Sequence, residues 1–236
     1  MGEVKKINKI VLDKNISPTI FIGSSMSQKE VKAIMKIEAD IKPPIRRGDL
    51  KQINPHTQLV AIVDGIFYSN LAISPREILD LLERGITVIG SSSMGALRAV
   101  ELDRYGMEGI GRIYNMYKNN IIQSDAEVAL TFSPKDYKPI TEPLVNIRYA
   151  IKEAEEHQIV SVSEVNTIVE CAKRIYFSDL SYNNLFKTLK GLIREETIEK
   201  LNRFINENKQ RLDLKRNDAI ELINYIDDMY ERYGKC

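Results

Sequence analysis

Residues 86–105 read ITVIGSSSMGALRAVELDRY, and this stretch decides the fold class of the chain. The run ITVI at residues 86–89 is rich in β-branched residues, which is typical of a strand buried on both faces of a parallel sheet. Gly90 and three serines then end the strand, and the pattern that follows predicts a helix. A strand, a turn and a helix in this order indicate an α/β protein.

The same order occurs twice more toward the N-terminus. The runs TIFI at residues 19–22 and LVAIV at residues 59–63 each end in a glycine-containing turn and lead into a helical pattern. Ser27 and Ser74 are expected to cap these two helices. We therefore expect a short parallel sheet with flanking helices over residues 1–140.

The second half of the chain is predicted to be all-helical. Nine of the twelve glycines fall between Gly23 and Gly111, so turns crowd the first half. After residue 140, apolar residues recur with the 3.6-residue period of amphipathic helices. Five helices are predicted, over residues 143–157, 163–177, 183–192, 194–208 and 218–234. We expect an α/β domain over residues 1–140 that holds an active-site cleft, and a helical region over residues 141–236 packed on it. The run EVALTF at residues 127–132 is expected to add a strand.

Composition and charge argue against several classes of protein. The chain has 236 residues, and its 34 basic and 33 acidic side chains give a net charge of +1, without the basic excess of a duplex nucleic-acid binder. No apolar run approaches the roughly 18 residues that read as a membrane span. The N-terminus is charged where an export signal is apolar. We therefore expect a cytoplasmic protein whose partners are neither nucleic acid nor membrane.

The soft metal ligands are too few and too scattered for a zinc site. Cys171 and Cys236 lie far apart in the sequence, as do His56 and His157. Both cysteines are expected to be free and non-catalytic, as is usual in a reduced compartment. We expect no metal and no cofactor.

Three turns are expected to meet at one edge of the sheet, because the carboxyl ends of parallel strands lie together and ligands bind beyond them. These turns are residues 23–25, 64–65 and 90–95. Gly90 and Gly95 have the spacing of a phosphate-binding loop, but Ala and Leu follow where that loop needs Lys and Ser or Thr. The sequence therefore argues against a triphosphate site. No G-x-G-x-x-G follows a strand, so a dinucleotide site lacks its fingerprint as well.

The third turn also resembles a nucleophile elbow, with Ser93 projecting at the start of a helix and Ser91 in place of the first glycine. Free amides of the first helical turn, that of Gly95 among them, are candidates to hold an oxyanion. The alternative is that Ser92 or Ser93 only caps the helix. A catalytic serine needs a base, and neither histidine is placed as one.

Charged residues near these turns complete the candidate site. Arg98 and Glu101 are spaced i, i+3 and are expected to pair, which would aim the guanidinium at the turn. Arg46 and Arg47 follow two prolines and form a pair of cations suited to a carboxylate. Asp64 ends a buried strand as a candidate acid. Each of these features also has a purely structural alternative. Arg98 and Glu101 would form only a surface ion pair, the arginine pair would lie in a solvated loop, and Asp64 would only form a turn.

Six motifs in this order resemble the TfuA core domain: FIGSSMS, PPIRRGDL, AIVDGIFY, REIL, GSSSMGALRAVELDRYGMEGIGRIY and EPLVNIR. The resemblance covers about residues 17–180, and its most specific parts are SMGALRA and PPIRRGD. It does not assign the helices after about residue 190.

The resemblance implies a role in forming peptide backbone thioamides. TfuA-like proteins act beside YcaO enzymes, which activate an amide oxygen with ATP and replace it by sulfur. In methanogenic archaea the product is a thioglycine of methyl-coenzyme M reductase. The task proposed for the family is to release sulfide from the thiocarboxylated C-terminus of a ubiquitin-like sulfur-carrier protein. The implied partners are that carrier and a YcaO-type enzyme, and a homo-oligomer stays open.

With this resemblance, Ser93, Asp64 and Arg98 are the expected catalytic residues of a thiocarboxylate hydrolase. Ser93 would attack the carbonyl, or its hydroxyl would only position a water, and Asp64 would act as base or orienter. The residues expected to bind the substrate are Arg46, Arg47, Ser92, Gly95, Glu101, Glu77, Glu142, Asn146 and Arg148. Of these, Glu77, Glu142, Asn146 and Arg148 match positions of the family motifs, as Arg112 does. Glu142 and Asn146 either cover the cleft from the helical side or tie the two halves together.

Two non-catalytic functions compete with the hydrolase. The first is a binding module that brings the carrier or sulfide to the YcaO enzyme, which the missing histidine base and the helix-rich second half favour. The second is a sensor of small anions that uses helix N-termini.

Overall fold

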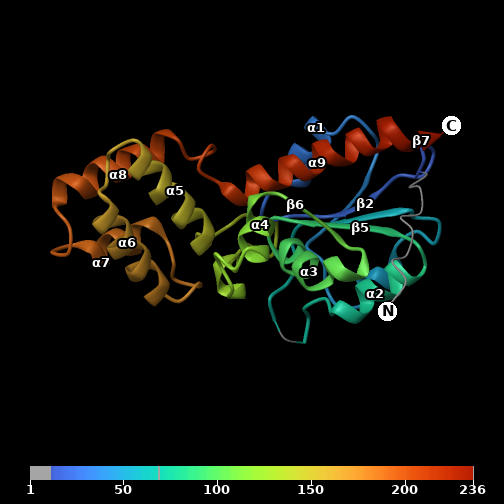
Figure 1. The fold of residues 1–236 in the computed structure, drawn as a ribbon, viewed down its shortest axis with the longest axis horizontal. Coiled ribbons are helices and arrows are strands. Elements are labelled where there is room, and N and C mark those ends of the chain that lie inside the picture. Colours follow the sequence, from blue (N-terminus) through green and yellow to red (C-terminus); the bar gives the residue numbers. More distant parts are fainter. Residues whose placement is uncertain (1–11, 69, 236) are drawn as a thin grey trace.

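A five-stranded parallel sheet forms the centre of the protein, with the strand order β3-β2-β4-β5-β6 (Figure 1). The computed structural model describes residues 12–68 and 70–235. The strands of the sheet are β2 (Thr19–Phe21), β3 (Asp40–Lys42), β4 (Leu59–Ile62), β5 (Thr87–Ser91) and β6 (Glu108–Ile110). A second, two-stranded parallel sheet pairs β1 (Leu12–Asp13) with β7 (Gly234–Lys235). The carboxyl ends of the five strands therefore lie along one edge, as the sequence predicts.

Helices cover both faces of the sheet and form a separate group beside it. The helices of the first half are α1 (Gln28–Ile34), α2 (Pro75–Glu83), α3 (Met94–Leu102) and α4 (Arg112–Lys118). Those of the second half are α5 (Leu144–Glu156), α6 (Val162–Arg174), α7 (Tyr182–Leu189), α8 (Glu195–Glu207) and α9 (Leu214–Tyr233). The short 3-10 helices are η1 (Asp49–Gln52), η2 (Asp103–Tyr105) and η3 (Asp125–Glu127). None of the helices in the described ranges has the length and apolar character needed to cross a membrane.

The strands are buried on both faces because neighbouring residues enter different cores. Val60 and Ile62 of β4 belong to a core with side chains from α2, α3 and α4, whereas Leu59 and Ala61 belong to a core with α1 and α9. This explains why the strands carry apolar residues at successive positions. The predicted buried strands are thus confirmed.

The helices α5–α8 have a hydrophobic core of their own, and α9 returns to the sheet. Figure 1 shows α5–α8 grouped beside the sheet and α9 running across one of its faces. Leu222, Ile223 and Ile226 of α9 pack in the same core as strand residues of β2 and β4. The boundary expected near residue 140 stays a prediction, but the last helix supplies one of the layers that cover the sheet.

The predicted elements agree with the structure except for one strand, and several elements, among them α4, were not predicted. The three predicted strands, the five predicted C-terminal helices and the serine caps of α1 and α2 are confirmed. The strand expected at residues 127–132 is wrong, because this segment begins in η3 and then only bridges Phe132 to Pro139. The short strands β3 and β6 were not predicted, since each has three half-buried residues and no apolar run.

Candidate functional site

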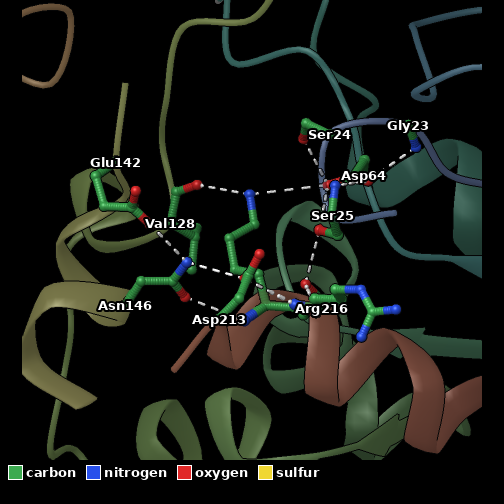
Figure 2. Close-up of polar contacts among 11 residues, drawn as sticks. Gly23, Ser24, Ser25, Asp64, Val128, Glu142, Asn146, Asp213 and Arg216 are labelled. Carbon is green, nitrogen blue, oxygen red and sulfur yellow. Dashed lines mark hydrogen bonds and ion pairs between the residues drawn. The ribbon is translucent and has the colours of Figure 1, made fainter. Parts of the chain in front are cut away.

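Asp64 brings the three predicted turns together at the carboxyl edge of the sheet. Its Oδ2 accepts the backbone amides of Gly23 at 2.9 Å and Ser25 at 2.8 Å. Its Oδ1 accepts the hydroxyls of Ser24 at 2.9 Å and Ser25 at 2.7 Å. The Ser25 hydroxyl in turn lies 2.9 Å from the hydroxyl of Ser92 in the turn after β5. Figure 2 shows Asp64 surrounded by the loop that follows β2.

Lys215 is the buried amine of this cluster, and no sequence motif predicted it. The side chain is 2 % exposed, and its Nζ donates to the carbonyl of Val128 at 3.2 Å. Nζ also lies 3.8 Å from Asp64 Oδ1, an ion-pair distance that is too long for a hydrogen bond. Burial lowers the pKa of Lys215, and the nearby Asp64 partly offsets this shift.

Ser91, the last residue of β5, and Ser92 attach α9 to the sheet. Ser91 donates to the carbonyl of Asp218 at 3.1 Å, and the Ser92 hydroxyl lies 2.9 Å from the carbonyl of Lys215. Ser92 has a φ of +64°, the rare backbone conformation that marks a nucleophile elbow, but its side chain is fully buried. Ser93 is 1 % exposed, and its side chain makes no capping hydrogen bond to α3. The predicted capping role of Ser93 is therefore wrong.

Gly90 and Gly95 are required for close packing of α3 on the sheet. A Cβ on Gly95 would lie 1.7 Å from the carbonyl oxygen of Ile62, and a Cβ on Gly90 would lie 2.1 Å from the carbonyl oxygen of Gly95. The amide of Gly95 donates to the carbonyl of Val63 at 3.2 Å. This amide is engaged within the fold and does not point freely at a ligand.

A pocket of about 510 Å³ opens between the sheet edge and the helices α5, α7, α8 and α9. Ser24 and Lys215 line it from the side of the Asp64 cluster, and Glu142 and Asn146 line it from the start of α5. Lys138 and Lys209 add two exposed cations to its lining. The lining thus combines Ser24 and Lys215 with two exposed lysines, of which Lys138 also pairs with Asp136 at 3.4 Å.

A second polar cluster forms the opposite wall of the pocket. The Asn146 side-chain amide donates to Glu142 and to Asp213, at 3.0 Å each, and its oxygen accepts the backbone amide of Lys215 at 3.1 Å. Figure 2 shows Glu142, Asn146 and Asp213 side by side. Burial raises the pKa of both carboxyl groups, and burial also raises the pKa of the neighbouring Tyr182.

Comparison with protein families identifies the chain. A family model described as "TfuA-like protein" matches residues 64–181, which is half of the sequence. The chain belongs to the TfuA-like family. A search of curated proteins finds no match. The segment matched to the TfuA-like family begins at Asp64 and contains Glu142 and Asn146, whereas Ser24 and Lys215 lie outside it.

Within this TfuA-like fold, Arg98 and Arg47 lie on another part of the surface than the pocket. Arg98 donates to the carbonyl of Ile73 at 3.0 Å and pairs with Glu101 at 2.7 Å, which confirms the predicted i, i+3 pair. Arg47 contacts the adjacent carbonyl of Ala72 at 3.4 Å. Arg98 and Glu101 line a different pocket of about 510 Å³. Arg46, Arg47, Arg98 and Arg148 are all absent from the lining of the pocket that holds Lys215.

The other predicted binding residues of the TfuA-like chain have structural partners. Glu77 completes the capping box of α2 and also accepts the amide of Gly48 at 2.6 Å. Arg148 forms two hydrogen bonds of 2.8 Å with Glu127, which is 5 % exposed. Of the predicted binding residues, only Glu142 and Asn146 line the Lys215 pocket. The hydrogen-bond partners of Asn146 are Glu142, Asp213 and Lys215, which all belong to the second half of the chain, so these bonds do not link the two halves.

Sequence reasoning missed Ser24, Asp213 and Lys215 as members of the site. Asp213 caps α9, and aspartate is favoured at the N-cap of a helix. This residue could therefore have indicated that the last helix begins at Leu214 and not at residue 218. No local pattern distinguishes Lys215 from the other lysines. Within residues 12–68 and 70–235, no group of His, Cys, Asp and Glu is arranged to hold a metal. Cys171 is free, whereas Cys236 lies outside the described residues.

Proposed function

We propose that this TfuA-like protein provides sulfide for thioamide formation by a YcaO-type enzyme, cleaving the thiocarboxylate at the C-terminus of a ubiquitin-like sulfur carrier. The observation that carries this proposal is the pocket into which both Ser24 and Lys215 open, with Asp64 directly behind them. The family membership supports the pathway, and the pocket supports the chemistry.

The pocket suits the extended, anionic tail of a carrier protein. Lys138 and Lys209 at its entrance attract a negative charge, and the N-terminus of α9 lies in its wall. The positive end of a helix dipole favours an anion by roughly 0.3–1 kcal/mol. The lysines thus take the role that the sequence suggested for Arg46, Arg47 and Arg98.

Ser24 is the attacking group in this proposal, in place of Ser93. Ser24 lines the pocket, whereas Ser93 is 1 % exposed and does not. The serine oxygen bonds to the thiocarboxylate carbon, the carbon–sulfur bond breaks, and the serine proton leaves with the sulfur as HS⁻. Water then hydrolyses the ester, which restores the serine hydroxyl and leaves the carrier with an ordinary carboxylate. Asp64 orients Ser24, and no cofactor is consumed.

A binding module without chemistry is the second candidate function. The burial of Ser92 and Ser93, at 0 % and 1 % exposure, favours it, because neither elbow serine meets a substrate in this conformation. In that case the same pocket holds the carrier tail for the YcaO-type enzyme.

The decisive experiment measures sulfide released from a thiocarboxylated carrier by the isolated protein over many turnovers. Carrier with an ordinary carboxylate is the blank, and Ser163→Ala on the exposed start of α6 is the matched serine control. Ser24→Ala is expected to lower the rate by ~100-fold or more, the scale on which proton-transfer and covalent catalysis contribute. If Ser93→Ala loses sulfide release and Ser24→Ala keeps it, Ser93 is the attacking residue. Tight carrier binding without sulfide release would establish the binding module.

A further inference from the structure

We infer that Lys215 is the proton carrier of this site, taking the proton of Ser24 and passing it to the departing sulfur. The inference rests on the proposed function and adds the base that the sequence lacks. Lys215 is a catalytic residue in this account because it lines the pocket beside the reacting serine.

Asp64 is poorly suited to accept the proton because its acceptor positions are already filled. A carboxylate offers about four lone-pair sites. Two backbone amides occupy Oδ2 and two hydroxyls occupy Oδ1, all at 2.7–2.9 Å. The amides of Gly23 and Ser25 are parts of the backbone and cannot turn away. Asp64 is therefore a positioning residue.

Lys215 has the geometry that Asp64 lacks. Its Nζ donates one hydrogen bond, to Val128, and lies 3.8 Å from the same Asp64 oxygen that holds the Ser24 hydroxyl. The Ser24 hydroxyl and the Lys215 amine are therefore both close to Asp64 Oδ1, and both Ser24 and Lys215 line the pocket. Asp64 also stabilises the ammonium that forms when Lys215 takes the proton.

The surroundings of Lys215 favour a neutral amine between turnovers. The side chain is 2 % exposed, and burial disfavours an ammonium. Lys215 is also the second residue of the 20-residue helix α9, where the positive end of the helix dipole opposes a cation. Glu142 and Asp213 act in the opposite direction, because their negative charges raise the pKa of Lys215, but burial is the largest influence and lowers it. A buried lysine of this kind is a common general base.

The histidines do not compete for this role. The Nδ1 of His157 lies 2.8 Å from the carbonyl of Glu153 on the outer side of α5, and His56 lies in an exposed loop. Neither histidine lines the pocket.

The proton balance closes without a co-reactant. In the first step neutral Lys215 takes the Ser24 proton as the carbon–oxygen bond forms, and the ammonium gives it to the sulfur, which leaves as HS⁻. In the second step water attacks the ester, and Lys215 takes a proton from this water. Lys215 then gives that proton to the Ser24 oxygen. The carrier carboxylic acid then ionises into solvent.

The test combines sulfide release with a titration of Lys215 that needs no activity. Lys215→Met keeps the volume of the side chain and removes the amine, and Lys200→Met on the exposed face of α8 is the control. We expect Lys215→Met to lose at least ~100-fold in rate, and to unfold at a lower urea concentration than the wild type because the Val128 carbonyl and the Asp64 carboxylate lose their buried neighbour. The rates are therefore compared without denaturant, where circular dichroism shows each variant to be folded. Lys215→Arg is expected to be equally inactive, because a guanidinium does not release its proton. A small primary amine is expected to restore part of the rate to Lys215→Ala.

The pH dependence provides the second readout. In protein labelled at the lysine Cε, the Lys215 carbon-13 signal, assigned by its loss in Lys215→Met, is expected to titrate at lower pH than that of exposed Lys200. The acid limb of the sulfide-release rate should follow the same midpoint. Asp64→Asn should move both to lower pH, because the attraction that favours the ammonium is lost.

The outcomes separate this inference from the proposed function. If the wild type releases sulfide and Lys215→Met stays within about threefold of it, the inference is overturned and the proposed function stands. If the wild type releases no sulfide, the proposed function fails and the catalytic role of Lys215 fails with it, whatever its titration. The inference is also overturned if the wild type releases sulfide but the Lys215 signal has the same titration midpoint as the signals of exposed lysines.

Discussion

Replacing Asp64 by alanine should cost this protein a large part of its folding free energy. Asp64 is 1 % exposed and accepts hydrogen bonds from the amides of Gly23 and Ser25 and from the hydroxyls of Ser24 and Ser25. The hydroxyls can rotate to new acceptors, but the two amides are held by the backbone. A buried donor left without a partner costs about 1–3 kcal/mol, so the two amides together cost roughly 2–6 kcal/mol. The free energy of unfolding of a typical domain is only about 5–15 kcal/mol, so this loss is a large part of it.

Asp64→Asn separates hydrogen bonding from charge. The carboxamide oxygen can accept both backbone amides from the Oδ2 position, while its NH2 group faces the two serine hydroxyls, which rotate to accept. The main loss is then the negative charge on Oδ1, to which the hydroxyls of Ser24 and Ser25 donate. We expect about 1–2 kcal/mol of destabilisation, well below that of the alanine variant.

Urea unfolding followed by far-ultraviolet circular dichroism measures both losses from the shift of the midpoint at unchanged m-value. Asp80→Ala is the control, because Asp80 forms an exposed ion pair with Arg76 on α2. Such surface pairs contribute about 0–1 kcal/mol. A loss below 1 kcal/mol in Asp64→Ala, or equal losses in the alanine and asparagine variants, would show that the two backbone amides do not depend on Asp64 for the stability of the fold.

Two further predictions concern the packing of α3 and the capping of α4, where the Asp218 carboxyl group accepts the backbone amides of Arg112 at 3.0 Å and Ile113 at 2.7 Å. Gly95→Ala places a Cβ 1.7 Å from the Ile62 carbonyl oxygen and should cost at least ~3 kcal/mol, whereas Gly85→Ala, which meets nothing within 4 Å at φ +79°, should cost about 1–2 kcal/mol by urea unfolding. Similar losses in the two variants would contradict this. Burial raises the pKa of Asp218 to about 7, so the folded state binds its proton more tightly than the unfolded state. Stability should therefore fall as pH rises from about 4 to about 7, and Asp218→Asn should flatten this part of the curve; an unchanged slope would argue against it.

Much of the fold could be predicted from the sequence because it depends on local patterns. Strands buried on both faces need successive apolar residues, and amphipathic helices need the 3.6-residue period, so β4, β5 and α5–α8 were recognisable. The meeting of the turns at Asp64 followed from parallel topology, since parallel strands end at the same edge. The strands β3 and β6 escaped prediction because three half-buried residues leave no periodic signal.

The composition of the pocket depended on contacts between distant segments. The apolar stripe of α9 shows that one face is buried but not which surface covers it, and only the folded chain brings this helix onto the sheet. That contact places Lys215 next to Asp64, although the two residues are 151 positions apart in the sequence. It also brings the hydroxyls of Ser91 and Ser92 within hydrogen-bond distance of carbonyls of α9. From the sequence follow the buried parallel strands, the edge at which their turns meet, and the acid after β4. The tertiary structure alone decided which serine opens to the pocket and which cation faces it, because both follow from the packing of α9.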